Sequence, residues 1–147
     1  MKDVLVRRAL RADLEAILAL YADDALSLHA LERDPARYEE AFAAIDRDAR
    51  SAVYVAEQGG AVVGTFQATV LEQLTGRVMQ LESVHVRSSV RGRGVGTVMM
   101  RWALADARAR GCRRVQLTTQ KRRVDAHRFY ARLGFVASHE GMKLDLG

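Results

Sequence analysis

The stretch Arg91-Gly92-Arg93-Gly94-Val95-Gly96-Thr97 follows a run of strand-forming residues that ends at Val86, and an amphipathic helical pattern begins inside it at Val95. Glycines let the backbone approach a ligand closely, and consecutive amides at a helix start direct partial positive charge towards an anion. Arg91 and Arg93 add formal charge for phosphate oxygens. The stretch therefore predicts a pyrophosphate-binding turn between a strand and a helix.

Two familiar phosphate motifs do not fit this turn. The dinucleotide fingerprint G-x-G-x-x-G needs glycine where Thr97 stands, and no Gly-Lys-Ser/Thr occurs in the chain. A dehydrogenase or a nucleoside triphosphatase is therefore disfavoured. The pattern Q/R-x-x-G-x-G/A does fit, with Arg91, Gly94 and Gly96, and it resembles the acyl-CoA loop of the GNAT superfamily of N-acetyltransferases.

A second motif lies downstream in the order that this family shows. The residues from Ala126 to Phe135 read A-H-R-F-Y-A-R-L-G-F. They resemble the helix-to-strand signature A-x-x-F/L-Y-x-x-x-G-F of the GNAT superfamily. Two motifs in the expected order are far more specific than one short glycine-rich loop.

Hydrophobic periodicity predicts the remaining elements. In chain order they are a strand over 4–8, helices from Leu14 and over 35–47, strands over 52–58, 61–71 and 77–86, a helix from Val95 towards Gly111, a strand over 113–119, a helix over 125–133, and one or two strands over 135–146. The order β-α-α-β-β-β-α-β-α-β(-β) predicts an α/β fold with a mixed sheet and helices on both faces, which is also the order of the GNAT-like fold.

Length and composition bound the class of protein. The chain has 147 residues, of which 49% are hydrophobic, with one proline and one cysteine. We expect a single domain over 1–147 without disulfides. No signal-peptide core or membrane-length apolar run is present, so we expect a cytoplasmic protein without a membrane partner. The net charge of +5 suits an anionic partner, and a phosphorylated cofactor explains the clustered arginines better than nucleic acid does.

The resemblance implies where acetyl-CoA binds. The thioester carbonyl and the pantetheine amides are expected to meet backbone groups of Val84, His85 and Val86. The pyrophosphate is expected to meet the turn, which comprises Arg91, Gly92, Arg93, Gly94, Val95, Gly96 and Thr97. Neither contact needs a metal, and the four histidines show no metal-ligand spacing.

Acetylation of an amine requires a base for the amine and an acid for the departing thiolate. The resemblance implies that Glu82 is the general base, directly or through water, and that Tyr130 is the general acid. A structural carboxylate paired with an arginine and a core tyrosine are the competing interpretations. His85 is a further candidate to assist proton removal if its side chain faces the cleft.

Several residues carry no predicted role. Relatives often place an asparagine seven residues before the signature tyrosine, where this chain has Arg123, so that pantetheine contact is not carried over. The run Lys121-Arg122-Arg123 is interpreted as a solvated charged face rather than a binding site. Glu57 and Glu72 match no family position, and Cys112 is interpreted as a core-facing residue.

These observations predict an acyltransferase that moves the acetyl group of acetyl-CoA to a primary amine of a small molecule by direct attack in a ternary complex. Three alternatives stay open: a protein N-terminal acetyltransferase of the ribosomal-protein type, an acetyl-CoA-binding module without turnover, and a basic nucleic-acid binder. The resemblance also allows for a homodimer. The first two helices and the turn over 71–76 are expected to shape the acceptor site.

Overall fold

The computed structural model describes residues 3–23 and 34–147. His29 therefore lies outside the described residues. The chain divides into two compact units, Met1–Leu117 and Thr118–Gly147, which are taken in turn.

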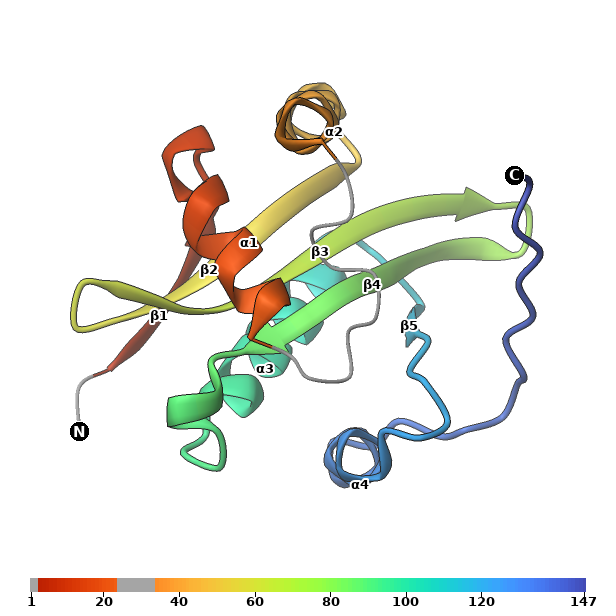
Figure 1. Ribbon diagram of the computed structural model, residues 1–147. Coiled ribbons are helices and arrows are strands. Elements are labelled where there is room, and N and C mark those ends of the chain that lie inside the picture. Colours follow the sequence, from red (N-terminus) through yellow and green to blue (C-terminus); the bar gives the residue numbers. More distant parts are fainter. Residues whose placement is uncertain (1–2, 24–33) are drawn as a thin grey trace. The chain divides into compact units, whose positions relative to one another are not determined.

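The first unit is built on a five-stranded sheet in the order β1-β2-β3-β4-β5 (Figure 1). The first four strands pair with antiparallel neighbours, and β5 runs parallel to β4. Parallel neighbours require a crossover, which α3 (Val95–Ala109) supplies. The strands are β1 (Val4–Arg8), β2 (Ser51–Gln58), β3 (Ala61–Gln73), β4 (Gly76–Val86) and β5 (Arg114–Leu117).

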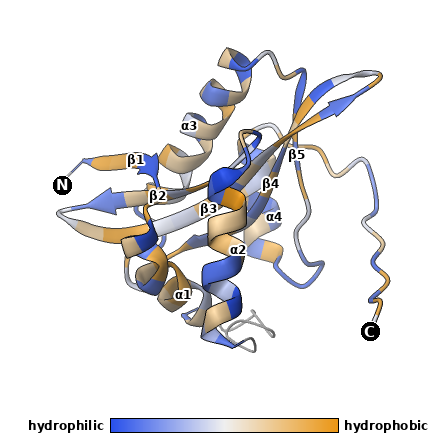
Figure 2. Ribbon diagram, turned by 90° about the horizontal axis from the view of Figure 1, so that it is seen from above, coloured by the Kyte–Doolittle hydropathy of each residue, from blue (hydrophilic) through white to orange (hydrophobic). Residues whose placement is uncertain are grey.

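Helices cover both faces of this sheet, as the sequence predicts. On one face α1 (Leu14–Ala22) and α2 (Pro35–Arg47) bring Ile17 and Phe42 against Val53 and Val55 of β2 (Figure 1). On the other face α3 packs against the sheet, and its ribbon is mainly hydrophobic in Figure 2.

Aromatic contacts fix the position of α3. The Trp102 ring lies 4.7 Å from the Tyr54 ring and 6.2 Å from that of Phe66, measured between centroids, and Met99 is fully buried. The sequence predicts an apolar stripe at helical spacing that comprises Val95, Val98, Met99, Trp102 and Ala103. The prediction is wrong for Val98, which is 39% exposed because the helix turns it away from the sheet, and Met100 is buried instead.

Local signals explain where several elements begin and end. Asp34 caps α2 by accepting a hydrogen bond from the Ala36 amide at 3.0 Å, and Pro35 occupies the first helical turn. Gly59 and Gly60 both have positive φ, 60° and 80°, which a two-residue turn between β2 and β3 requires. The sequence predicts both features.

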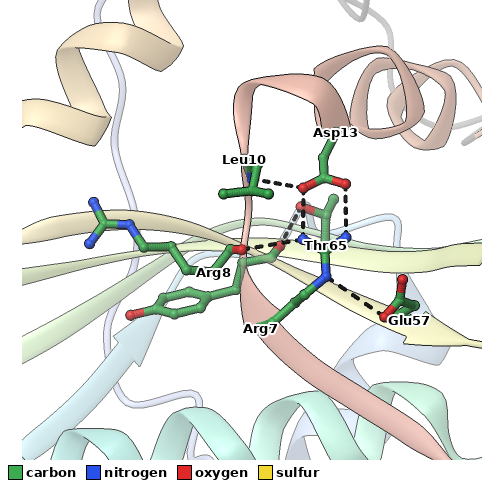
Figure 3. A network of polar contacts seen from close by, with 7 residues as sticks. Arg7, Arg8, Leu10, Asp13, Glu57 and Thr65 are labelled. Atoms are coloured by element: carbon green, nitrogen blue, oxygen red, sulfur yellow. Dashed lines mark hydrogen bonds and ion pairs between the residues drawn. The ribbon is translucent and has the colours of Figure 1, made fainter. Parts of the chain in front are cut away.

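A polar network joins β1 to the start of α1 (Figure 3). The Arg7 guanidinium donates two hydrogen bonds to the Asp13 carboxylate, at 2.8 and 2.9 Å, and lies 3.8 Å from Glu57. The Leu10 amide donates to the same carboxylate at 2.7 Å. Principally because of the Arg7 hydrogen bonds, the pKa of Asp13 lies below its ordinary value.

The second unit contains α4 (Val124–Arg132). The sequence predicts that four residues of this helix face inward: Ala126, Phe129, Tyr130 and Leu133. All four are half-buried while their neighbours are exposed, which confirms the prediction. The predicted strands over 135–146 are not formed, because residues 135–147 enter no β ladder. Alternating apolar residues suit a strand but do not make one without a hydrogen-bonding partner, and Val136, Met142 and Leu144 are at least 80% exposed.

Candidate active site

The glycine-rich turn opens α3 with unpaired amides. Gly92 and Gly94 adopt left-handed φ values of 78° and 88°, and a Cβ atom on either would meet nothing within 4 Å. These glycines are thus required by backbone conformation and not by packing. Gly94 is the N-cap residue of α3, and no side chain of the described residues caps the helix, so its first amides are available to an anion.

Three contacts fix the segment that leads into this turn. Arg91 donates from Nε to the Val86 carbonyl at 3.1 Å, and Arg87 donates from Nη2 to the Val62 carbonyl at 2.8 Å. The carboxylate of Asp23, the C-cap residue of α1, accepts from both the amide and the hydroxyl of Ser88, at 2.7 and 2.9 Å. The hydrogen bond from the Ser88 amide is the main cause that lowers the pKa of Asp23, and the hydrogen bond from the Ser88 hydroxyl is the second cause.

The end of β4 is open on one side. β5 pairs with β4 only from Val78 to Leu81. Among residues 3–23 and 34–147, no strand pairs with β4 beyond Leu81 on that side. Backbone groups of the segment Glu82–Val86 are therefore available to an extended ligand, which would run along the strand edge towards the glycine-rich turn.

A bulge reorients the residues of this open end. Glu82 pairs with Gln67 and His85 pairs with Thr65, so the two residues between Glu82 and His85 face a single residue of β3. Partners in an antiparallel pair point to the same face, and Gln67 and Thr65, two residues apart, share one face. Glu82 and His85 therefore project to the same face, which their spacing of three would not give in a regular strand. Ser83 lies in the bulge with φ of 51°.

The last turn of α1 contacts this bulge. The Tyr21 ring lies 4.8 Å from the His85 ring between centroids, and the Ser83 side chain interacts with its hydroxyl. Burial raises the pKa of Tyr21, so its phenol stays protonated at neutral pH. The face that carries Glu82 and His85 is thus the one covered by α1.

Glu82 ends a row of polar side chains that runs from the edge strand β5 onto β4. Gln116 of β5 donates from Nε2 to Oε1 of Gln80 at 2.9 Å, and Gln80 donates from Nε2 to Oε1 of Glu82 at 3.3 Å. The Glu82 side chain is exposed and forms no ion pair with an arginine of residues 3–23 or 34–147, in contrast to Glu72, which pairs with Arg77. This arrangement leaves a carboxylate available to a polar molecule.

Tyr130 belongs to the second unit, between the rings of Phe129 at 5.2 Å and Phe135 at 5.6 Å. Burial raises its pKa to about 12, and the positive charge of Arg123 opposes that shift. Its phenol therefore holds its proton throughout the neutral range. The structure brings Glu82, Val84–Val86 and the glycine-rich turn together on one continuous segment, and the approach of Tyr130 to them stays a prediction.

The remaining candidates have structural surroundings. Cys112 is half-buried, and burial raises the pKa of its thiol, which does not favour a nucleophile. His127 contacts the Gln120 carbonyl through Nε2 at 2.9 Å. Within the described ranges, no group of three or more His, Cys, Asp or Glu residues has the arrangement of a metal site. The same residues include no helix long and apolar enough to cross a membrane.

Sequence comparison agrees with this geometry. The acetyltransferase (GNAT) family model matches residues 14–135, so the chain belongs to the GNAT family of acetyltransferases. Members of this family use acetyl-CoA.

The similar proteins carry names that state different functions. The chain is 29% identical over 136 residues to an aminoalkylphosphonate N-acetyltransferase of Salmonella typhimurium, covering 91% of this chain and 86% of that protein. A solved structure described as a transcriptional regulator from Bacillus halodurans C-125 is 39% identical, with a TM-score of 0.92 over 98% of this chain and 100% of that one. An acetyltransferase from Trypanosoma brucei is 26% identical, with a TM-score of 0.80 over 98% and 100% of the two chains.

Proposed function

We propose that this protein is an acetyl-CoA-dependent N-acetyltransferase that acetylates a primary amine of a small molecule by direct attack in a ternary complex. The observation that carries the proposal is the continuity of the open edge of β4 with the uncapped start of α3. One segment thereby offers amide donors both for a thioester arm and for a pyrophosphate. Membership of the GNAT family supports the same assignment.

Coenzyme binding would use mainly backbone groups. Amides from Gly92 to Thr97 would hold the pyrophosphate, and main-chain groups of Val84–Val86 would bind the pantetheine arm and polarise the thioester carbonyl. The buried Val95 side chain contributes packing only. Arg93 is exposed and adds positive charge near the phosphates.

The chemistry follows from the two candidate side chains. Glu82 would remove a proton from the acceptor ammonium, and the free amine would attack the thioester carbon to form the C–N bond. The C–S bond then breaks, the sulfur takes the phenolic proton of Tyr130, and the nitrogen loses its second proton, which restores the phenol. With a pKa of about 12, Tyr130 is a weaker acid than an ordinary thiol, whose pKa is about 8.5, so its proton transfer to the sulfur is uphill and is completed by the proton from the nitrogen.

A second candidate function is an acetyl-CoA-binding regulator without turnover. The 39% identical Bacillus halodurans structure is described as a transcriptional regulator, which supports this second candidate. Such a protein would bind the coenzyme in the same turn, and it would not need the carboxylate of Glu82. Turnover in the wild-type protein, lost in Glu82→Gln, separates the two functions.

Calorimetric titration with acetyl-CoA tests coenzyme binding. We expect micromolar affinity in the wild-type protein and none in Arg91→Glu/Gly94→Glu, which places two carboxylates in the turn. Arg101→Glu/Ala105→Glu is the matched control, because it adds the same groups to an exposed part of α3 and should bind normally. No binding by a folded wild-type protein would overturn the proposal.

The free thiol that acetyl-CoA releases on transfer is then measured with different amines to identify the acceptor. Because one relative is named for aminoalkylphosphonates, the first panel should compare an aminoalkylphosphonate, the corresponding simple amine and a peptide with a free N-terminus. Preference for the small amines supports the proposed substrate class, and preference for the peptide supports an N-terminal acetyltransferase. The homodimer and the cytoplasmic location stay predictions.

A further inference from the structure

We propose that the last turn of α1 is a positioning device for the active site, in which Tyr21 holds the β4 bulge and Asp23 holds the entrance to the glycine-rich turn. The inference rests on the proposed function, because it concerns the same site. It assigns roles to two residues outside both sequence motifs. Both side chains leave the same helix end and contact the segment Ser83–Ser88 at its two ends.

The contact of Tyr21 bears on the bulge conformation. Ser83 is the one non-glycine residue with positive φ among residues 3–23 and 34–147, and a side chain at φ of 51° is strained. The interaction between its side chain and the Tyr21 hydroxyl offsets this strain. The Tyr21 ring also packs beside His85, so the residues on both sides of Val84 are held by one tyrosine.

The contact of Asp23 fixes the other end. Its carboxylate accepts both polar hydrogens of Ser88, in the turn Ser88–Val90 that precedes the glycines. Charge-assisted bonds of 2.7 and 2.9 Å restrict both the backbone and the side chain of this residue. The segment between the two anchors contains Val84–Val86, whose main chain is the proposed thioester contact.

The two anchors should affect different kinetic constants. Tyr21 acts nearest to Glu82 and the carbonyl-binding amides, so its loss should lower kcat. Asp23 acts nearest to the phosphate-binding turn, so its loss should weaken acetyl-CoA binding. A purely structural role would lower stability without separating these constants.

The experiment compares Tyr21→Phe and Asp23→Ala with matched controls. Tyr21→Phe keeps the ring beside His85 and removes the hydroxyl, and Tyr54→Phe makes the same change on the α3 face. We expect kcat to fall about three- to tenfold in Tyr21→Phe, the range of one hydrogen bond, and to stay within twofold of wild type in Tyr54→Phe. We expect Asp23→Ala to raise the acetyl-CoA Kd by a similar factor at unchanged kcat. Asp46→Ala, which removes an α2 carboxylate that pairs with Arg8, should change neither.

A rescue variant tests the strain argument. Glycine at position 83 adopts the left-handed conformation without strain. Tyr21→Phe/Ser83→Gly should therefore recover kcat to within twofold of wild type. Tyr21→Phe/Ser83→Ala keeps a Cβ and should stay as slow as Tyr21→Phe, because both substitutions remove the same interaction. Equal kcat in wild type and Tyr21→Phe, or no difference between the two double variants, would overturn the inference.

Hydrogen exchange separates this inference from the proposed function. Amides of Val84–Val86 should exchange about three- to tenfold faster in Tyr21→Phe than in wild type, whether or not the protein binds acetyl-CoA. If the wild-type protein does not bind the coenzyme, the proposed function fails and the exchange result alone decides the role of Tyr21. Unchanged exchange at these amides would overturn that role.

Discussion

Glu82 differs from the other strand carboxylates in its neighbours. Its side chain lies at the end of an amide row from Gln116 through Gln80, whereas Glu72 is bound to Arg77. An amide neighbour carries no charge, so the partner of Glu82 in this row differs in kind from the arginine that Glu72 contacts. Glu57, similarly, lies 3.8 Å from Arg7 and belongs to the β1 network.

Glu82→Gln should lower kcat by about a hundredfold to ten-thousandfold, the range for loss of a general base, and should leave the acetyl-CoA Kd unchanged. Glutamine keeps the size and the hydrogen bonds of the side chain. Steady-state kinetics with the preferred amine measure the effect, and Glu72→Gln is the control. A rate above one tenth of wild type would remove Glu82 from the mechanism.

Tyr130→Phe should lower kcat about tenfold to a hundredfold without changing coenzyme affinity, because only proton donation to the sulfur is lost. An acid must be protonated to act, and the Tyr130 phenol, with its pKa of about 12, stays protonated well above neutral pH. The pH profile of kcat should therefore show no loss of this acid below about pH 10. Equal losses of kcat and coenzyme affinity would contradict the assignment.

Among the elements, α3 offers a comparison between its two ends. Gly94 before it and Gly111 after it have φ values of 88° and 75°, and a Cβ on either would meet nothing within 4 Å. Alanine at either position should therefore cost about 1–2 kcal/mol of unfolding free energy. Only Gly94→Ala should also weaken acetyl-CoA binding, by tenfold or more, because only that end bears the phosphate-binding amides. Equal affinities in the two variants, measured by calorimetry, would contradict the loop assignment.

Sequence patterns predicted those elements whose determinants lie within a few residues. The Asp34-Pro35 helix start, the Gly59-Gly60 turn and the glycine-rich turn are of this kind. The bulge has no such local signal. Nothing in the sequence around Ser83 distinguishes it from an ordinary strand serine, because the contact with Tyr21 of α1 exists only in the folded protein. The alternation over 135–146 is the opposite case, where a local pattern predicts strands that lack a ladder.

In the molecule as a whole, the polar network between β1 and the start of α1 makes the free energy of unfolding depend on pH. The Asp13 pKa lies below its ordinary value of 3.8, so its stabilising contribution is present above that value and is lost as the pH falls through the folded-state pKa. Asp13→Asn should reduce the free energy of unfolding by about 1–2 kcal/mol at neutral pH. The difference from wild type should shrink as the pH falls below about 4. Urea denaturation at several pH values measures it, and a difference independent of pH would contradict the ion pair.

The distribution of buried residues bears on how the chain is made. Every fully buried side chain among the described residues lies between Val6 and Ala107, inside the first compact unit. At usual translation rates, a ribosome needs about 1.5–6 s to add residues 118–147. That interval exceeds the folding time of many small domains. The residues of the sheet, of the glycine-rich turn and of the α1 anchors are therefore all made before the segment that bears Tyr130.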